Sequence, residues 1–362
     1  MDVGELQKMG PEQHPDFLWT WKSNSRSSKA SIWLPYFSQA KKIPRSKSWS
    51  IEYNGGTLQL DLAQVDFLMF YGASGDVPLA FLDDAAKHGI VILLHRRNIS
   101  SPYVFYPANE GGPTDLLSHQ INVRSHVQKR TYIAKVLIRE RLKPMLSHIP
   151  IPRGQMLELN EAKTIASVRS IEAKTTKRYW DAWYDKLDIE AHRREQHPLN
   201  AGLDAGSKFM FGVILRWLVF HKFSPNHGFL HEPTSYPSLV YDLMEPYRYL
   251  IEDAAARAWQ RCDGTEKDCV AKTLVRLKDN LDEICYVPAT RQYVRRKNLL
   301  HGAVLALRSY LLGEMKRLVI PVEGVPNGGR PPAVAYRLPG SVYDMNRKKP
   351  TVGKKEEELG EF

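Results

Sequence analysis

The chain has 362 residues, 43% hydrophobic and 25% charged, which is typical of a globular protein long enough for two domains. Cys262, Cys269 and Cys285 form no Cys-x-x-Cys pair, which argues against a disulfide framework or zinc ribbon and fits a reducing compartment. The polar N-terminal sequence does not resemble a signal peptide, and the longest apolar stretch, 209–220, is too short to cross a bilayer.

The net charge of +11 is distributed unevenly. Residues 1–115 hold 11 Lys+Arg and 12 Asp+Glu, whereas residues 116–362 hold 40 and 28. Such a basic surplus favours a polyanionic partner, and nucleic acid is the common one. We therefore expect DNA to contact the second part of the chain. The alternative is a solvated basic surface with no partner.

The N-terminal part has the patterns of β-strands. Residues 1–29 are polar and predicted to be flexible. Alternating or short apolar runs predict strands at 31–37, 49–53, 58–62, 65–71 and 90–94. Asn54-Gly55-Gly56 predicts a hairpin turn, and Pro78 with Gly89 predicts a short helix over 78–87. We expect residues 30–115 to form a small β-rich domain.

Helical spacing dominates after a linker at Pro107 to Asp115, which holds two Gly and two Pro. Helices are predicted over 116–143 and, approximately, 157–188, 200–222, 238–260, 264–284 and 289–318. The fold class expected is α+β, with a small N-terminal β-rich domain followed by a larger all-α C-terminal domain. Residues 116–323 would be the helical catalytic and DNA-binding domain, and 324–362 a disordered tail.

Two acids stand close together late in this helical region. Asp242 and Glu245 are three residues apart, so a helix places them on one face. Pro246 cannot donate a hydrogen bond to the carbonyl of Asp242, so we expect a kink there. Taken alone, such a pair is more often a solvated helix face than a site.

His231 and Glu172 are further candidates for chemistry. His231 ends a turn, Pro-Asn-His-Gly-Phe-Leu-His, where a histidine is more often a capping or core residue than a ligand. Glu172 is either a surface acid paired with a base or a metal ligand beside phosphate-binding residues. Phosphodiester chemistry needs a hard cation with carboxylate ligands, and manganese also accepts imidazole. Spacing alone does not bring Glu172 to His231.

Read in order, these segments resemble the CRISPR-associated integrase of spacer acquisition, the first-numbered Cas protein family. The family pattern is Gly-Phe-Leu-His, a short gap, then Asp-Leu-Met-Glu-Pro-Phe-Arg. It matches 228–231 and 242–248, except that Tyr247 replaces Phe. Segment 171–180 is similar to the acid-bearing helix of the family, and 200–220 to its buried helix before the turn. The resemblance covers roughly residues 30–320.

The resemblance implies a metal-dependent DNA endonuclease and integrase, which inserts spacer DNA into a CRISPR array by 3′-hydroxyl attack on a repeat phosphodiester. It implies that Glu172, His231 and Asp242 are both the catalytic residues and the ligands of a Mg²⁺ or Mn²⁺ ion. Glu245 is a candidate for supporting these ligands. Candidates for DNA binding are Lys174, Lys177, Arg178 and Arg248.

Expected partners are double-stranded DNA as prespacer and CRISPR repeat, a second copy in a homodimer, and the small second-numbered Cas protein. A prokaryotic cytoplasmic location is expected. Two alternatives stay open. One is a metal-dependent nuclease on branched DNA without integration, which would cut and never join. The other is a non-catalytic DNA-binding scaffold, whose binding would ignore divalent metal.

Overall fold

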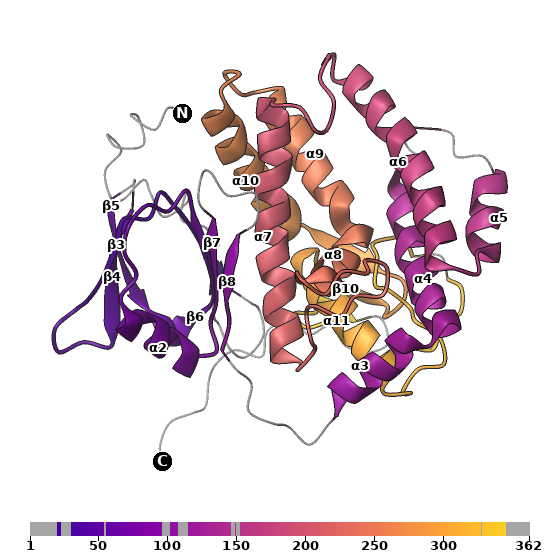
Figure 1. Cartoon of the computed structure of the whole chain (residues 1–362), viewed down its shortest axis with the longest axis horizontal. Helices are drawn as coiled ribbons and strands as arrows, with labels where there is room; N and C mark the ends of the chain where they lie inside the picture. The colour runs from indigo at the N-terminus through magenta and orange to yellow at the C-terminus, as the bar shows by residue number, and fades with distance from the viewer. Residues whose placement is uncertain are drawn as a thin grey trace.

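The structure, a computed structural model, describes residues 20–22, 30–53, 56–95, 102–107, 115–145, 149, 153–326 and 328–344. Figure 1 shows a β-rich N-terminal part beside a larger, mainly helical C-terminal part. This arrangement confirms the α+β class that the change of hydrophobic period predicted.

Two sheets build the N-terminal part. The strands are β1 (Thr20–Lys22), β2 (Ala30–Pro35), β3 (Gln39–Lys42), β4 (Ser48–Tyr53), β5 (Gly56–Asp61), β6 (Val65–Tyr71), β7 (Val91–His95) and β8 (Tyr103–Phe105). One sheet has the order β1-β2-β6-β7-β8, with β2, β6 and β7 parallel, and the other is antiparallel β3-β4-β5. The helix α2 (Leu79–Lys87) makes the crossover that the parallel pair β6 and β7 requires.

The predicted hairpin is present as the pair β4 and β5, although Asn54 and Gly55 of its turn lie outside the described residues. Strands β1, β3 and β8 were not predicted. One face of the first sheet packs on the second sheet and on α2, through a core that includes Leu34, Leu68 and Phe81. Alternate residues of a strand point to opposite faces, so the intervening residues of the first sheet form a second apolar face.

That second face packs on α7 (Pro198–Phe220), which Figure 1 shows running along β7 and β8. Phe67 of β6 meets Phe209 of α7, with ring centroids 6.2 Å apart. At Gly212 an added Cβ would lie 1.9 Å from Cζ of Phe67, so only a glycine lets the helix approach the sheet this closely. A single core of buried residues therefore joins the two parts of the chain.

The remaining helices are α3 (Leu116–Ser125), α4 (Val127–Met145), α5 (Arg153–Glu161), α6 (Ile165–Lys186), α8 (Ser238–Met244), α9 (Arg248–Trp259), α10 (Glu266–Asp282) and α11 (Lys297–Leu311). The helix predicted over 116–143 is interrupted at His126, which has extended backbone angles. At Pro246, where a kink was expected, a 3-10 turn, η3 (Glu245–Tyr247), separates α8 from α9.

The helix predicted over 289–318 is wrong at its start. β9 (Ile284–Val287), β10 (Gln292–Arg295) and β11 (Tyr343–Asp344) form a third sheet, in the order β11-β10-β9. The buried residues of β9 and β10 alternate with half-buried or exposed ones, as in strands packed on one face.

The predicted disordered tail, 324–362, is wrong in its described part. Tyr336 and Leu338 are buried, and the side chain of Gln292 bonds to both the N–H and the carbonyl of Leu338, at 2.9 and 3.0 Å. Burial and hydrogen bonds thus hold Tyr336 and Leu338 in a segment whose Gly and Pro content suggested disorder. Residues 345–362, the linker residues 108–114 and most of 1–29 lie outside the described residues, while Thr20–Lys22 belongs to the first sheet.

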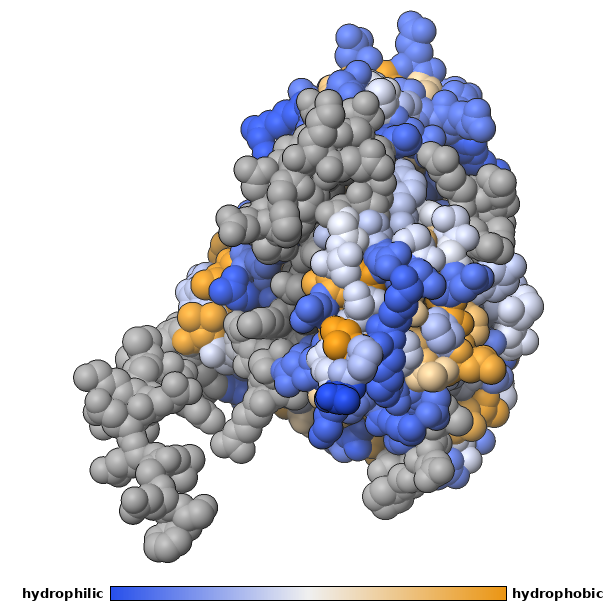
Figure 2. All heavy atoms as spheres, turned by 90° about the vertical axis from the view of Figure 1, so that its left-hand side faces the viewer, coloured by the Kyte–Doolittle hydropathy of each residue, from blue (hydrophilic) through white to orange (hydrophobic). Residues whose placement is uncertain are grey.

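The described surface of the β-rich end is mostly hydrophilic, with separate hydrophobic patches, as Figure 2 shows. This part of the chain exposes Leu79 on α2 and Tyr103 and Phe105 on the edge strand β8. None of the described helices is long and apolar enough to cross a membrane.

Candidate functional site

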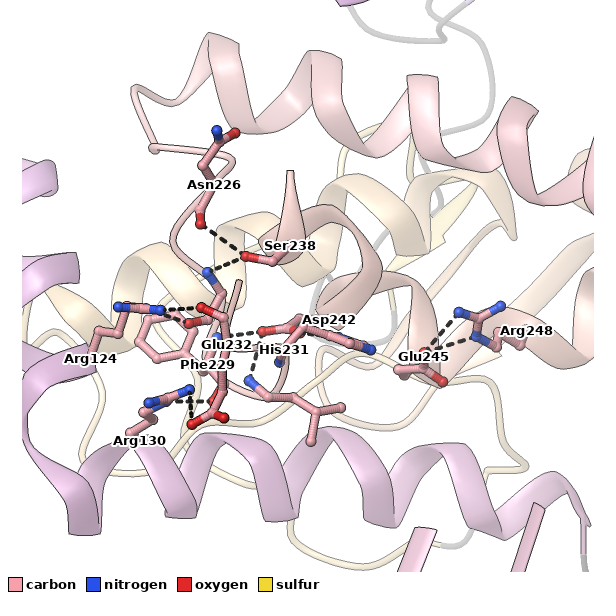
Figure 3. Close-up of polar contacts among 12 residues, drawn as sticks. Arg124, Arg130, Asn226, Phe229, His231, Glu232, Ser238, Asp242, Glu245 and Arg248 are labelled. Carbon is pink, nitrogen blue, oxygen red and sulfur yellow. Dashed lines mark hydrogen bonds and ion pairs between the residues drawn. The ribbon is translucent and has the colours of Figure 1, made fainter. Parts of the chain in front are cut away.

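The buried carboxylate of Asp242, on α8, organises the Gly-Phe-Leu-His turn (Figure 3). Its Oδ2 accepts hydrogen bonds from the backbone N–H groups of Phe229 and Leu230, and its Oδ1 accepts one from the N–H of His231 at 3.0 Å. At Gly228 an added Cβ would lie 2.8 Å from Oδ2 of Asp242. The glycine of the motif is therefore needed for the turn to wrap around this carboxylate.

The imidazole of His231 also bonds to Asp242. Its Nδ1 lies 2.7 Å from Oδ1 of Asp242, so Nδ1 carries the hydrogen and Nε2 keeps a free lone pair. Burial lowers the pKa of His231, but the hydrogen bond to Asp242 and the charge of Asp242 outweigh burial, and the pKa is raised. About a quarter of this side chain is exposed (27%), which leaves the imidazole accessible from the surface.

Glu245 lies one helical turn further along, where the chain forms η3. Its Oε1 is 2.9 Å from Nε of Arg248, and its Oε2 is 3.6 Å from Nε of Arg141. Arg141 is itself buried and bonds to Glu252 at 2.6 Å, and the hydroxyl of Tyr179 donates to the same carboxylate at 2.8 Å. The buried Arg141 therefore carries a positive charge between two carboxylates.

Glu172, on α6, interacts electrostatically with this group of residues. Burial raises the pKa of Glu172, and the negative charge of Glu245 raises it further, against the opposing charges of Arg141 and Arg248. The charge of Glu245 also acts on His231. The charge of Glu245 thus acts on both Glu172 and His231.

The structure brings only some of the predicted site residues together. It brings His231 and Asp242 into contact, and it places Glu172 within reach of the charge of Glu245. Across the described ranges, no three His, Cys, Asp or Glu side chains gather closely enough to hold a metal ion. The basic candidates Lys174, Lys177 and Arg178 are exposed on α6, while the guanidinium of Arg248 is paired with Glu245.

Three residues in contact with the turn were not found from the sequence. Gln120 and Arg124 of α3 and Arg130 of α4 donate hydrogen bonds to its carbonyl groups. These contacts span about a hundred residues of sequence, and no local pattern marks them.

The donor atoms suit a divalent cation in their chemistry. Two carboxylates, Glu172 and Glu245, and the Nε2 of His231 are the ligand types that magnesium or manganese accepts. Burial, and to a lesser extent the charge of Glu245, raises the pKa of Glu172, and a bound cation would favour its charged form.

The fold and the site together define a protein in which a β-rich part is packed on a helical part that holds a His–Asp pair beside two further acids. Residues 43–283 match the family model described as CRISPR associated protein Cas1. The chain belongs to this family.

Individual relatives agree with this assignment. The CRISPR-associated endonuclease Cas1 of Clostridium perfringens is 23% identical over 224 residues, which cover 56% of this chain and 68% of that protein. The structure of a CAS1 protein from Thermotoga maritima superposes with a TM-score of 0.66 at 17% identity, covering 81% of this chain and 100% of that one. A casposase bound to integration product gives 0.64 at 17% identity, covering 79% and 91%. At such identities the structural likeness shows a shared fold.

Proposed function

We propose that this chain is a metal-dependent DNA endonuclease and integrase that inserts spacer DNA into a CRISPR array, by attack of a 3′-hydroxyl on a repeat phosphodiester. Membership of the Cas1 family supports this proposal, as does a relative named as an endonuclease. The observation that carries it is the contact of His231 with Asp242 beside Glu172 and Glu245. The basic surplus after residue 115 supports DNA as the substrate.

We propose Glu172, Glu245 and Nε2 of His231 as the groups that hold the ion, in place of Asp242 as a direct ligand. Both oxygens of Asp242 are filled by four hydrogen bonds, three of them from backbone N–H groups that only opening of the turn would release. Glu245 instead bonds Arg248, a partly exposed side chain that can turn away. Asp242 then orients the imidazole, as carboxylates behind metal-bound histidines do.

A bound Mg²⁺ or Mn²⁺ ion would supply the polarisation of the target phosphate and stabilise charge on the leaving oxygen. The chain's own residues place the substrate. Arg248, beside Glu245, would contact the target phosphate. The exposed basic side chains of α6 would bind neighbouring phosphates of the strand; they are Lys174, Lys177 and Arg178. Arg141, 3.6 Å from Oε2 of Glu245, would hold this carboxylate in place.

The proposed partners are a prespacer duplex, the CRISPR repeat, a second copy of the chain and the small second-numbered Cas protein. Strand β8 is a sheet edge that exposes Tyr103 and Phe105, a surface that a homodimer would cover. Light scattering at micromolar concentration should give twice the chain mass. A strictly monomeric mass would contradict the dimer.

The function is tested by joining a labelled duplex with free 3′ ends to a plasmid that carries the repeat. Joining should need magnesium or manganese and stop in chelator. Glu172→Gln, His231→Asn and Glu245→Gln should each lower joining by at least a hundredfold, while DNA affinity changes little, because the ion contributes chiefly in the transition state. Asp181→Asn, an exposed acid on the same helix as Glu172, is the matched control and should join normally.

The products separate the proposal from its alternatives. Cutting of branched DNA without any joined product would identify a nuclease. DNA binding that ignores both metal and the three substitutions, with no change of product, would identify a scaffold. Full joining by Glu245→Gln together with loss of metal binding by Asp242→Asn would restore Asp242 as the direct ligand.

A further inference from the structure

The turn that carries His231 is held from two sides, as Figure 3 shows. On one side its N–H groups bond to side chains of α8: that of Gly228 to the hydroxyl of Ser238 at 3.0 Å, and the following three to Asp242. On the other side its carbonyl groups bond to two arginines. Fixing both sides of the peptide chain leaves the turn little freedom to rotate.

The arginine contacts are specific in geometry. Arg124 donates from Nε to the carbonyl of Gly228 and from Nη2 to the carbonyl of Glu232, both at 2.8 Å. Arg130 donates from Nε to the carbonyl of Phe229, also at 2.8 Å. The planar guanidinium of Arg124 thus bridges Gly228 and Glu232, the residue that follows His231, which the single ammonium of a lysine does poorly.

The break between α3 and α4 allows both arginines to contact the same turn. In a continuous helix, residues six apart point about 120° away from each other, so Arg124 and Arg130 would not meet the same turn. The extended backbone at His126 (φ −86°, ψ 102°) redirects the chain, and both side chains converge. Gln120, one turn earlier on α3, accepts from the N–H of Ser224 at 3.0 Å and donates to its carbonyl at 2.9 Å.

A phosphate-binding role for the two arginines fits these contacts less well. The donors named above are already committed to carbonyl oxygens, at distances typical of strong hydrogen bonds. Arg124 and Arg130 repel each other, and the charges of Asp242 and Glu232 oppose this effect on Arg124; Nη2 of Arg130 lies 3.4 Å from Oε1 of Glu232. The arrangement favours a fixed support over a surface that releases and rebinds DNA.

We propose that Arg124 and Arg130 are positioning residues, which fix the direction of the His231 imidazole by holding the carbonyl side of its turn. The catalytic meaning of this inference rests on the proposed function, whereas the restraint of the turn does not. Loss of residues that orient a metal-bound histidine typically lowers metal affinity ten- to a hundredfold. The same loss here should lower kcat and leave the KM for DNA nearly unchanged.

The test compares Arg124→Met and Arg130→Met with Arg139→Met in the full chain. Arg139 is also on α4, but bonds to Asn160 at 2.7 Å, away from the turn. Hydrogen exchange of the amides of residues 229–231 should be at least tenfold faster in the first two variants and unchanged in the control. The affinity for Mn²⁺, measured by electron paramagnetic resonance, should fall ten- to a hundredfold in the same two variants only.

Arg124→Lys keeps the charge and one donor, and it should recover part of the lost manganese affinity if the methionine variant folds poorly. Unchanged amide exchange in both arginine variants would overturn the inference. Faster exchange with manganese affinity and kcat as in the parent protein would also overturn it, because the arginines would then be purely structural. If the parent protein binds no manganese, the proposed function fails, while amide exchange still decides whether the arginines restrain the turn.

Discussion

The imidazole Nδ1 of His231 lies 2.7 Å from Oδ1 of Asp242, a carboxylate with no exposed surface. The same carboxylate accepts the N–H groups of three consecutive residues of the turn. Asp242 therefore has two roles, since it shapes the backbone around His231 and selects the tautomer of its side chain. A substitution at this position affects folding as well as chemistry.

Asp242→Asn should lower the free energy of unfolding by about 3 kcal/mol, because an amide nitrogen would face donors that now bond to a charged oxygen. Urea denaturation at neutral pH measures the change. The exposed Asp181→Asn should stay within about 0.5 kcal/mol of the parent protein. A stability equal to that of the parent protein for Asp242→Asn would show that the buried carboxylate is not holding the turn.

The sequence marked candidate site residues but did not predict the contacts that each of them makes. The Gly-Phe-Leu-His and Asp-Leu-Met-Glu segments marked His231, Asp242 and Glu245 by their resemblance to a family. The use of each carboxylate oxygen depends on tertiary contacts, such as the bond from Arg124 to Gly228 across 104 residues. Periodicity and spacing carry no information on such contacts, so the hydrogen-bond partners of Asp242 and Glu245 could not be predicted from the sequence.

Gly212→Ala should destabilise the protein by about 1–3 kcal/mol, because the new methyl group would overlap the ring of Phe67. Thermal and urea unfolding measure the effect. Gly154→Ala, on α5, places a methyl group in open space and should not lower stability. Adding Phe67→Leu to Gly212→Ala should recover part of the loss. If the loss of stability in the double variant equals the sum of the losses in the two single variants, the helix and the sheet do not meet as described.

Acid should destabilise the protein through His221 and His301, whose Nε2 atoms are 2.8 Å apart. Burial lowers the pKa of His221 to about 4 and that of His301 to about 2. The unfolded chain binds protons below about pH 6.5 while the folded chain does not, so stability falls as the pH drops from about 7 towards 4. At pH 5 the loss should be about 2 kcal/mol for each histidine.

The measurement is urea unfolding at several pH values between 7.5 and 5. The double variant His221→Gln/His301→Gln should show a flatter dependence on pH than the parent protein. The exposed His119→Gln is the control, and it should keep the parent slope. Equal slopes for the double variant and the parent would mean that both histidines titrate normally in the folded protein.

The affinity for DNA should fall with salt concentration because of the exposed basic side chains of α6. One variant replaces all three, Lys174, Lys177 and Arg178, by alanine. The slope of the logarithm of the DNA association constant against the logarithm of the salt concentration should become shallower by about 0.9 for each phosphate that these side chains neutralise in the parent protein. Fluorescence anisotropy over a salt series measures it. The matched control replaces three exposed bases of the N-terminal part, Lys41, Arg45 and Lys47. A larger change of slope in that control would place the DNA on the β-rich part.

Much of the fold could be predicted because its signals are local. Strands β6 and β7 are apolar runs buried on both faces, as parallel strands between two layers require. Strands β9 and β10 have only four residues each, too few to separate a period of 2 from a helical one. The partner of β10, Tyr343–Asp344, lies in a segment whose composition suggested disorder. Their sheet depends on contacts that a local pattern cannot show.

The helix α7 connects two places that the chain separates widely. One side of it rests on the sheet at Phe67, and its C-terminal end leads directly into the turn that carries His231. A helix of 23 residues is a stiff rod of about 35 Å. Gly212, which meets the sheet, lies only eight residues before the end of α7, so the sheet and the turn are held by the same two turns of helix. A substitution that shifts α7 on the sheet should therefore also disturb the turn that carries His231.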